Sequence, residues 1–274
     1  MNPLFVREHI RRFLEEDIGR GDVTTEALRP SGSVRALVVA KEEGILAGSP
    51  FAAEVFSLLG GVKVKTLKGE GERFQRGEAL LELEGEAQSI LTGERVALNL
   101  LQSLSGIATR TRKFVEALEG TGVRLLDTRK TTPGYRYFQK YAVRVGGGLN
   151  HRFALYDMVL IKDNHKRIMG GLREAVRAVK ERVGPAYRIE VEVGNLEEVE
   201  EALEEGVDLI MLDNFSPEEV GSAVELIGGR AQVEVSGNIT LENLRDYAVR
   251  GVDFVSSGSV IYRASWIDLS LRVL

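Results

Sequence analysis

The pattern of apolar and polar residues divides the chain into two regions of different rhythm. Apolar residues recur at helical spacing over residues 3–18, and Gly19 ends the predicted helix. Over residues 34–83, short apolar runs alternate with glycines and charges, which predicts strands and tight turns around one helix at 49–59. Residues 88–118 have a helical pattern, and Ser105-Gly106 is interpreted as a break in it near a domain boundary.

After residue 122 the chain alternates regularly between strands and helices. The predicted strands are 123–126, 158–161, 188–193, 208–212, 232–235 and 253–256. The predicted helices are 168–183, 196–205, 216–227 and 240–249, the third opened by the capping box Ser216-Pro-Glu-Glu219. Strands separated by helices of this length pair in parallel. Because a polar cluster follows each strand, we expect a barrel, whose strand ends all meet at one face, rather than an open sheet.

Composition excludes several classes of protein. The 274 residues contain no cysteine, which rules out disulfides, zinc–thiolate sites and cysteine nucleophiles. The formal net charge of −5 argues against a general nucleic-acid binder. No apolar run approaches the roughly 18 residues of a membrane span, and the charged N-terminus lacks a signal-peptide core. We therefore expect a cytoplasmic globular protein with neither nucleic acid nor membrane as a partner.

Against this acidic background, basic residues gather between residues 124 and 167. They are Arg124, Arg129, Lys130, Arg136, Lys140, Arg144, Arg152, Lys162, Lys166 and Arg167. Arg129-Lys130 and Lys162 directly follow predicted strands, so they are expected at the barrel mouth, where a buried cation needs an anionic partner. The members interpreted as solvated surface are Arg124, Arg136, Lys140 and Lys166. The segment from Asp127 to His165 is thus predicted to bind small phosphates and carboxylates.

Two carboxylates end successive predicted strands. Glu192 and Asp213 are expected close together and suit a hydrated Mg²⁺ ion, although a salt bridge with a nearby lysine or arginine would also satisfy them. Glu190 alternates with Glu192, so that one face of the strand carries only carboxylates, but it is a weaker ligand candidate. His151 lies beside Arg152 and can hydrogen-bond a carboxylate, whereas the role of His165 stays open.

Three glycine-rich turns can present backbone N–H groups to an anion. They are Gly146-Gly147-Gly148, Ser236-Gly237-Asn238 and Ser257-Gly258-Ser259, and the last two stand at neighbouring strand ends. No phosphate-binding loop of nucleotide triphosphatases and no dinucleotide-binding glycine fingerprint is present, which disfavours those two functions.

Several of these residues fall in runs that resemble quinolinate phosphoribosyltransferase (nicotinate-nucleotide pyrophosphorylase, carboxylating). The runs are EDIGRGDVTT (16–25), GERVALN (93–99), LSGIAT (104–109), DTRKTTPG (127–134), QKYAVR (139–144), GGGLNHR (146–152), LIKDNH (160–165), EVEV (190–193) and LDNF (212–215). They occur in order over nearly the whole chain, which makes the resemblance specific.

The resemblance implies an α/β protein with two domains. Residues 1–105 would form an N-terminal α/β sandwich, hammerhead-like and completed by the C-terminal tail. Residues 106–265 would form the incomplete parallel α/β barrel of a type II phosphoribosyltransferase, with the active site. The implied enzyme, a pentosyltransferase, joins quinolinate to phosphoribosyl pyrophosphate with Mg²⁺. It releases pyrophosphate and CO₂ and gives nicotinate mononucleotide, a precursor in NAD biosynthesis.

The resemblance also implies roles for individual residues. The quinolinate pocket would contain Arg95, Arg129, His151, Arg152 and Lys162. The contacts to phosphoribosyl pyrophosphate and Mg²⁺ would come from Lys130, Lys162, Glu192 and Asp213, with Glu192 and Asp213 as metal ligands. Thr128 is a further expected substrate-binding residue. The 5′-phosphate would lie against Ser236, Gly237, Asn238, Ser257, Gly258 and Ser259. Direct catalytic roles fall to Lys130, Glu192, Asp213 and Arg95. Arg95 would reach the neighbouring subunit's site, which implies a homodimer and is compatible with a higher assembly of dimers.

One departure and two alternatives accompany this prediction. Where the family often has Leu-Thr-His-Ser, this chain has Val260-Ile-Tyr-Arg263, so Tyr262 replaces a histidine and altered local contacts are expected. A paralogue of the same fold could act on another acceptor, as a molybdenum-transport-associated relative or a nicotinate phosphoribosyltransferase. A carrier role is the third possibility, because residues 62–83 resemble lipoyl and biotinyl hairpins, but the turn with the modified lysine is missing.

Overall fold

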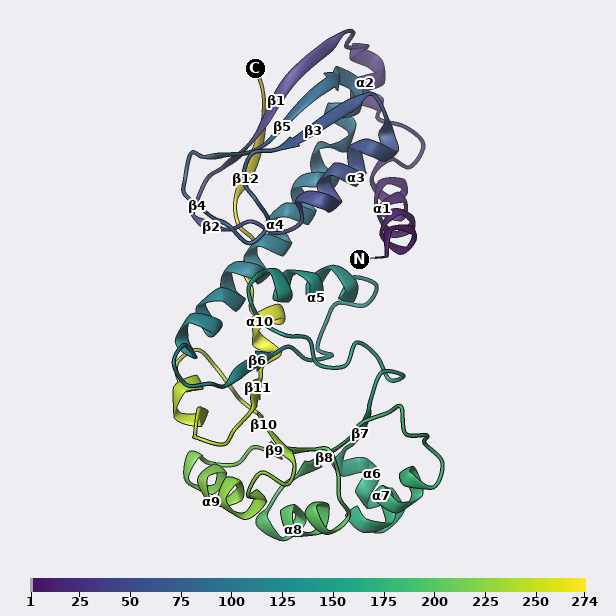
Figure 1. Ribbon diagram of the computed structural model, residues 1–274. Coiled ribbons are helices and arrows are strands. Elements are labelled where there is room, and N and C mark those ends of the chain that lie inside the picture. The colour runs from purple at the N-terminus through teal and green to yellow at the C-terminus, as the bar shows by residue number, and fades with distance from the viewer. Residues whose placement is uncertain (1) are drawn as a thin grey trace. The chain divides into compact units, whose positions relative to one another are not determined.

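The computed structural model describes residues 2–274, which form two compact units (Figure 1). The first unit comprises Met1–Arg112, Tyr137–Gly147 and Ala264–Leu274. The second comprises Lys113–Arg136 and Gly148–Arg263. Each unit has its own sheet and core, and each is described by itself.

The first unit is built on a four-stranded antiparallel sheet in the order β12-β1-β5-β3. Its strands are β1 (Ser33–Ala40), β3 (Val62–Thr66), β5 (Ala79–Glu86) and β12 (Leu269–Val273), beside a two-stranded pair of β2 (Gly44–Ile45) and β4 (Arg73–Phe74). Its helices are α1 (Pro3–Ile18), α2 (Val23–Leu28), α3 (Ser49–Leu59), most of α4 (Ala87–Ala117) and nearly all of α5 (Arg136–Val145). The C-terminal strand β12 completes the sheet by pairing with β1.

Helix α5 was not predicted, because the sequence analysis considered only the basic residues of this segment and not its apolar pattern. The ring of Phe138 packs edge-on against Phe51 of α3, with 4.8 Å between ring centroids, and packs at a tilt against Phe13 of α1, with 5.5 Å between centroids. These contacts bury the helix in the core of the first unit. The interpretation of Lys140 as solvated surface is therefore wrong, since only 2% of this residue is exposed.

Helix α4 is continuous, and the break expected at Ser105-Gly106 is wrong. A Cβ on Gly106 would lie 2.0 Å from the backbone oxygen of Ser265, so this glycine admits the C-terminal segment against the helix instead of ending it. Ser105 is buried and accepts a hydrogen bond from the backbone N–H of Ala47 at 3.1 Å. The two units divide within this helix, after Arg112.

The second unit is a curved parallel sheet of six strands in the order β6-β11-β10-β9-β8-β7. Its strands are β6 (Arg124–Leu126), β7 (Val159–Ile161), β8 (Ile189–Val193), β9 (Leu209–Asp213), β10 (Gln232–Ser236) and β11 (Phe254–Ser256). Its helices are α6 (Asp163–Met169), α7 (Leu172–Lys180), α8 (Leu196–Glu204), α9 (Pro217–Ile227), the 3₁₀ turn η1 (Leu244–Tyr247) and α10 (Ser259–Tyr262). Within residues 2–274 no strand pairing joins β7 to β6, so the predicted incomplete barrel is confirmed.

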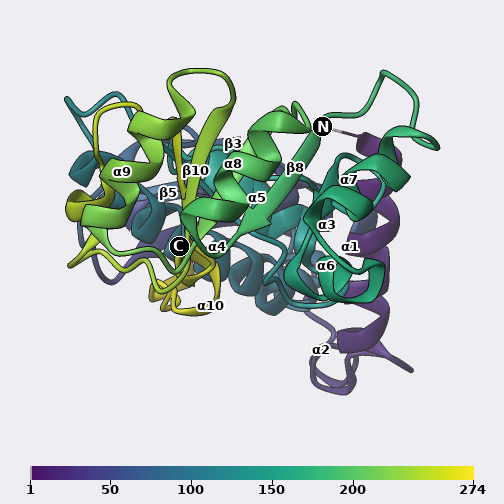
Figure 2. The ribbon, with the colours of Figure 1, turned by 90° about the horizontal axis from the view of Figure 1, so that it is seen from below.

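Helices α7, α8 and α9 cover the outer face of this sheet, as Figures 1 and 2 show. The core residues of β9, Leu209 to Leu212, are all buried, as expected for a parallel strand covered on both faces. The predicted capping box of α9 is confirmed, because Ser216 accepts a hydrogen bond from the Glu219 N–H while its own N–H donates to the Glu219 carboxylate.

Two predicted helices of the second unit differ from the structure. The helix expected at 168–183 is divided by Gly170, which ends α6 at a φ of +91°. Lys166 in α6 is 6% exposed and bonds the Glu198 carboxylate at 2.7 Å, so its interpretation as surface is also wrong. In place of the helix expected at 240–249, the chain forms only the short 3₁₀ turn η1. The Asn243 side chain accepts a hydrogen bond from the Thr240 N–H at 2.8 Å, which bends the backbone before a helix can begin.

No helix in the described part of the chain is both long enough and apolar enough to cross a membrane.

Two glycines inside helices make a matched test of this packing. Gly106→Ala should lower the free energy of unfolding by about 1–3 kcal/mol, because the added methyl group overlaps the backbone of Ser265. Gly221→Ala in α9 should raise it by about 0.5–1 kcal/mol, because nothing lies within 4 Å of its Cβ position. Urea unfolding of both variants measures the difference. Equal effects of the two substitutions would contradict the close approach at Gly106.

Candidate active site at the carboxyl end of the parallel sheet

A cavity of about 840 Å³ lies at the carboxyl ends of the strands in the second unit. The predicted site residues that line it are Thr128, Arg129, Lys130, His151, Arg152, Lys162, Glu192, Asp213, Ser236, Gly237, Asn238, Ser257, Gly258 and Ser259. Lining residues that the prediction left out are Leu160, Met211, Asn214, Glu234, Ile239, Thr240, Ser256, Tyr262 and Arg263. Arg95 is the predicted residue outside this wall, exposed on α4 of the first unit.

The turn after β10 is shaped by contacts with the turn after β9. Gly237 has a φ of +102°, and a Cβ there would lie 2.3 Å from the Asn214 side-chain oxygen. The same oxygen accepts a hydrogen bond from the Asn238 amide at 3.1 Å. Glycine is therefore required at 237 both by its backbone conformation and by lack of space.

The turn after β11 packs against the segment that follows β6. A Cβ on Gly258 would lie 3.0 Å from Lys130 Cδ and from Thr128 Oγ1, so this glycine lets the two segments approach. The Ser257 hydroxyl donates to the backbone oxygen of Ile239 at 2.8 Å and lies 2.8 Å from the Ser259 hydroxyl. These contacts hold the turn rigidly beside Lys130.

Two arginines of the cavity present donors that have no protein acceptor. The Nε atoms of Arg129 and Arg152 are buried, and neither has a hydrogen-bond partner within residues 2–274. In the part of the chain that the structure describes, the Arg152 guanidinium is anchored through Nη1, which donates to the backbone oxygen of Met158 at 3.1 Å. Burial, and then the nearby Arg129 guanidinium, lower the pKa of Arg152. Two desolvated guanidinium groups side by side create a site for an anion.

The cavity also carries a mixed group of charges at the ends of β7, β8 and β9. Lys162 Nζ donates to Glu192 Oε2 at 2.6 Å. Glu192 therefore forms the salt bridge that the sequence analysis gave as an alternative to a metal contact. Burial, and then the Glu192 carboxylate, raise the pKa of Asp213. Glu192 and Asp213 line one cavity from adjacent strands and supply the oxygen donors that Mg²⁺ prefers, so the residues present fit the predicted ion.

The other predicted polar residues have structural contacts. His165 Nδ1 accepts the Lys162 backbone N–H at 2.9 Å and so caps α6. Arg136 is half-buried and donates to Thr131 Oγ1 at 2.9 Å and to the Phe153 oxygen at 3.1 Å, which corrects its interpretation as solvated surface. Arg124 is exposed, as expected, with its guanidinium 4.7 Å from the centre of the Phe254 ring.

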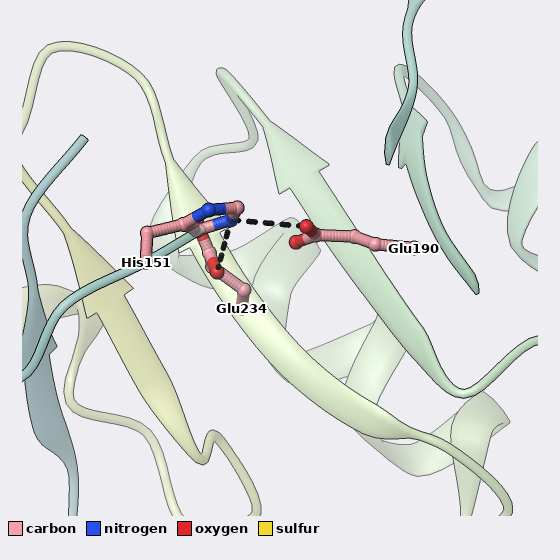
Figure 3. Close-up of side chains that lie close together, drawn as sticks. All are labelled: His151, Glu190 and Glu234. Carbon is pink, nitrogen blue, oxygen red and sulfur yellow. Dashed lines mark ion pairs between the residues drawn. The ribbon is translucent and has the colours of Figure 1, made fainter. Parts of the chain in front are cut away.

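A buried cluster of His151, Glu190 and Glu234 belongs to this site (Figure 3). His151 Nε2 lies 3.0 Å from Glu190 Oε2 and 3.5 Å from Glu234 Oε2, and neither glutamate is exposed. The sequence prediction missed Glu234, which lines the cavity. A signal was present, because a charged residue at the centre of the predicted strand 232–235 must face either a partner or a site.

The protonation of His151 follows from its neighbours. The backbone N–H of Arg152 donates to His151 Nδ1 at 2.7 Å, so Nδ1 carries no proton. In the neutral ring the proton is then on Nε2, which lies close to both glutamates. The potential ligand atoms of the cluster lie within 4.8 Å of one another, close enough for a metal ion, but a protonated Nε2 cannot bind one. The cluster is therefore a set of close ion-pair contacts, in which Nε2 and the four carboxylate oxygens have no hydrogen-bond partner within residues 2–274.

Burial dominates the acid–base behaviour of the two glutamates. Burial raises the pKa of Glu190, and nearby Glu234 and Arg152 lower it by a smaller amount. It also raises the pKa of Glu234, to about 8, and the neighbouring Glu190 charge adds to the shift. Glu234 therefore stays protonated at neutral pH.

Comparison with known proteins agrees with this geometry. The model of the quinolinate phosphoribosyl transferase N-terminal domain matches residues 22–105, and that of the C-terminal domain matches residues 107–272. The chain belongs to the quinolinate phosphoribosyltransferase family. The family resemblance predicted from the sequence is thus confirmed.

Individual relatives match this chain over nearly their full lengths. A protein of Synechocystis named probable nicotinate-nucleotide pyrophosphorylase [carboxylating] is 45% identical, with 97% of this chain and 91% of the relative covered. A protein of Bacillus subtilis with the same name is 43% identical, with 100% and 95% covered. The solved nicotinate-nucleotide pyrophosphorylase of Francisella tularensis superposes with a TM-score of 0.94 at 42% identity, with 100% and 98% covered. These likenesses confirm the predicted fold.

The raised pKa of Glu234 makes stability depend on pH. An unfolded glutamate ionises at about 4.5, whereas folded Glu234 holds its proton up to about 8, so stability falls as the pH rises through this window. Glu234→Gln removes the ionisation, and its melting temperature relative to wild type should therefore rise between about pH 5 and about pH 8. Over this range we expect the free energy of unfolding of the variant, relative to that of wild type, to rise by more than about 1.4 kcal/mol, the equivalent of one pKa unit. Calorimetry across this range would contradict the assignment if the difference between the two proteins stayed constant.

Proposed function

We propose that the cavity binds quinolinate together with phosphoribosyl pyrophosphate and joins them. The products are nicotinate mononucleotide, pyrophosphate and CO₂, as the name of the family relatives implies for NAD biosynthesis. One observation carries this proposal. The two buried, unpartnered Nε donors of Arg129 and Arg152 share a cavity with the glycine turns at Gly237 and Gly258, so one cavity offers sites for carboxylates and for phosphates.

Quinolinate binds on the arginine side of the cavity. Its two carboxylates accept hydrogen bonds from Arg129 and Arg152, and Lys162 supplies a further positive charge. This pairing gives each of the two buried Nε donors a carboxylate acceptor, which is why a pyridine with two carboxylates fits better than one with a single carboxylate. A nicotinate phosphoribosyltransferase, or another paralogue with a different acceptor, is disfavoured for the same reason.

Phosphoribosyl pyrophosphate binds on the side of the glycine turns. The turns Ser236–Asn238 and Ser257–Ser259 hold the 5′-phosphate, and Lys130 with Thr128 faces the pyrophosphate. Glu192 and Asp213 would hold Mg²⁺, which when bound neutralises charge on the pyrophosphate. The same carboxylates can stabilise positive charge at the ribosyl carbon as its bond to pyrophosphate breaks.

Decarboxylation follows ribosyl transfer. The quinolinium ring carries a positive nitrogen beside the carbon that holds the 2-carboxylate. When CO₂ leaves, this nitrogen stabilises the electron pair that remains on the carbon, and a proton then takes the place of CO₂. The chain contributes position and electrostatics, and no side-chain nucleophile is needed.

The site is completed by a second subunit in this proposal. Arg95 is exposed on α4 and has no place in the cavity wall of its own chain, which supports a homodimer in which it enters the neighbouring site. Higher assemblies of dimers are compatible with this arrangement. We place the enzyme in the cytoplasm, where NAD precursors are made. Tyr262, which lines the cavity in place of a histidine, alters local contacts without removing the activity.

An assay with phosphoribosyl pyrophosphate and Mg²⁺ tests the function directly. Quinolinate as acceptor should give nicotinate mononucleotide and one CO₂ for each pyrophosphate released. Nicotinate, which lacks one carboxylate, is the matched control and should react poorly. Turnover of nicotinate but not of quinolinate would overturn the proposal and point to the paralogous activity.

Arg152→Ala tests the assignment of the arginine side. It should raise KM for quinolinate by about tenfold or more and change KM for phosphoribosyl pyrophosphate much less, because a bidentate carboxylate contact is lost. Arg182→Ala removes an exposed guanidinium beyond the end of α7 and should leave both constants unchanged. Equal losses for the two substrates in Arg152→Ala would contradict the assigned role.

A further inference from the structure

The side of the cavity that holds the 5′-phosphate has hydrogen-bond donors but no assigned positive charge. The turns Ser236–Asn238 and Ser257–Ser259 offer backbone N–H groups and polar side chains, all of them neutral. The Ser257 hydroxyl already donates to the backbone oxygen of Ile239 at 2.8 Å, so it is not available as a donor. A phosphate monoester carries a charge of about −1.5 to −2 at neutral pH, and its removal from water is costly unless a cation lies beside it. A basic residue is therefore needed on this side.

One basic residue of the cavity wall has no role so far. The lysine and arginine residues that line the cavity are Arg129, Lys130, Arg152, Lys162 and Arg263. The first four are already assigned to the carboxylates of quinolinate or to the pyrophosphate. Arg263 is exposed, and its guanidinium forms no hydrogen bond and no ion pair within residues 2–274. Its charge is therefore available to a ligand.

We propose that Arg263 binds the 5′-phosphate of phosphoribosyl pyrophosphate and supplies the positive charge that the two glycine turns lack. The proposal rests on the proposed function, because it takes phosphoribosyl pyrophosphate as the ligand and the two turns as the site of its 5′-phosphate. Arg263 stands where the family often has serine, the last residue of the Leu-Thr-His-Ser run. The contact is therefore a feature of this chain and not one that the family resemblance implies.

The fold places Arg263 beside one of these turns. Helix α10 begins at Ser259, the last residue of the turn, and the backbone N–H of Arg263 donates to the Ser259 oxygen at 3.2 Å. Residues four apart in a helical turn lie on the same face, so the side chain of Arg263 leaves the backbone on the side of Ser259. Both residues line the cavity, which puts the guanidinium within reach of a phosphate held by the turn.

The neighbouring residue Tyr262 lies on the pyrophosphate side of the same turn. A Cβ on Gly258 would lie 3.0 Å from Tyr262 Cε1 and also 3.0 Å from Lys130 Cδ, so the tyrosine ring lies near the lysine that faces the pyrophosphate. Consecutive residues of a helix point in directions about 100° apart, so Arg263 does not share the place of Tyr262 beside Lys130. This separation favours Arg263 for the 5′-phosphate and leaves the pyrophosphate to Lys130.

The binding of two fragments of phosphoribosyl pyrophosphate tests the proposal without turnover. Ribose 5-phosphate carries only the 5′-phosphate, and pyrophosphate, added with Mg²⁺, represents only the leaving group. In titration calorimetry, Arg263→Gln should weaken the binding of ribose 5-phosphate by about tenfold and that of pyrophosphate by less than about twofold, because one charge-assisted contact is lost. Arg263→Lys should bind ribose 5-phosphate more tightly than Arg263→Gln, because lysine also binds phosphate as a point charge.

The matched control is Arg250→Gln, which removes an exposed charge near the amino end of β11, outside the cavity wall, and should change neither affinity. The proposal is overturned if Arg263→Gln loses as much affinity for pyrophosphate as for ribose 5-phosphate, or loses affinity for neither. A wild-type protein that does not bind ribose 5-phosphate would overturn it as well.

Steady-state kinetics separate this proposal from the proposed function. In Arg263→Gln, KM for phosphoribosyl pyrophosphate should rise about tenfold and KM for quinolinate should stay nearly unchanged, which is the opposite of the pattern expected for Arg152→Ala. An unchanged KM for phosphoribosyl pyrophosphate would contradict the role of Arg263. A wild-type protein that binds ribose 5-phosphate through Arg263 but does not turn over quinolinate would instead count against the proposed function alone.

Discussion

The site depends on keeping the buried Glu190 and Glu234 away from the desolvated guanidinium groups of Arg129 and Arg152, which lie in the same barrel. A cavity for anionic substrates must hold its basic side chains in place without pairing them with protein carboxylates before the substrate binds. Each cation that paired fully with a protein carboxylate would have to give up that partner before it could bind substrate. Arg152 is instead anchored to a neutral carbonyl group, which fixes it and leaves its charge available.

The two-residue period of a strand organises these charges into layers. Glu190 and Glu192 are two residues apart on β8 and therefore share a face, as do Glu234 and Ser236 on β10. The upper members, Glu192 and Ser236, line the cavity, and Glu192 pairs with Lys162. The lower members meet beneath them at His151. The same strand face therefore carries cavity-lining residues at the carboxyl end of the strand and buried residues that contact His151 one layer below.

The features that sequence predicted well are those with a local signal. The polar residues that follow each strand were expected to meet at one face, and Lys162, Glu192 and Asp213 do line one cavity. Features that depend on distant contacts were not predicted. Gly106 is needed because Ser265 approaches it, and helix α5 is held by the rings of Phe13 and Phe51. Neither partner is marked in the local sequence, which is why the glycine was interpreted as a helix break and the helix was overlooked.

A neutral histidine is well suited to stand between the glutamates and the arginine. If Glu190 met the Arg152 guanidinium directly, the two would form a buried ion pair, and the arginine would lose the charge with which it binds a carboxylate. Glu190 does act on Arg152 electrostatically, but no ion pair joins them within residues 2–274. His151 Nε2 lies 3.0 Å from Glu190 Oε2, and its Nδ1 accepts the backbone N–H of Arg152. An imidazole can do both at once because it donates at one nitrogen and accepts at the other, which neither lysine nor arginine can do.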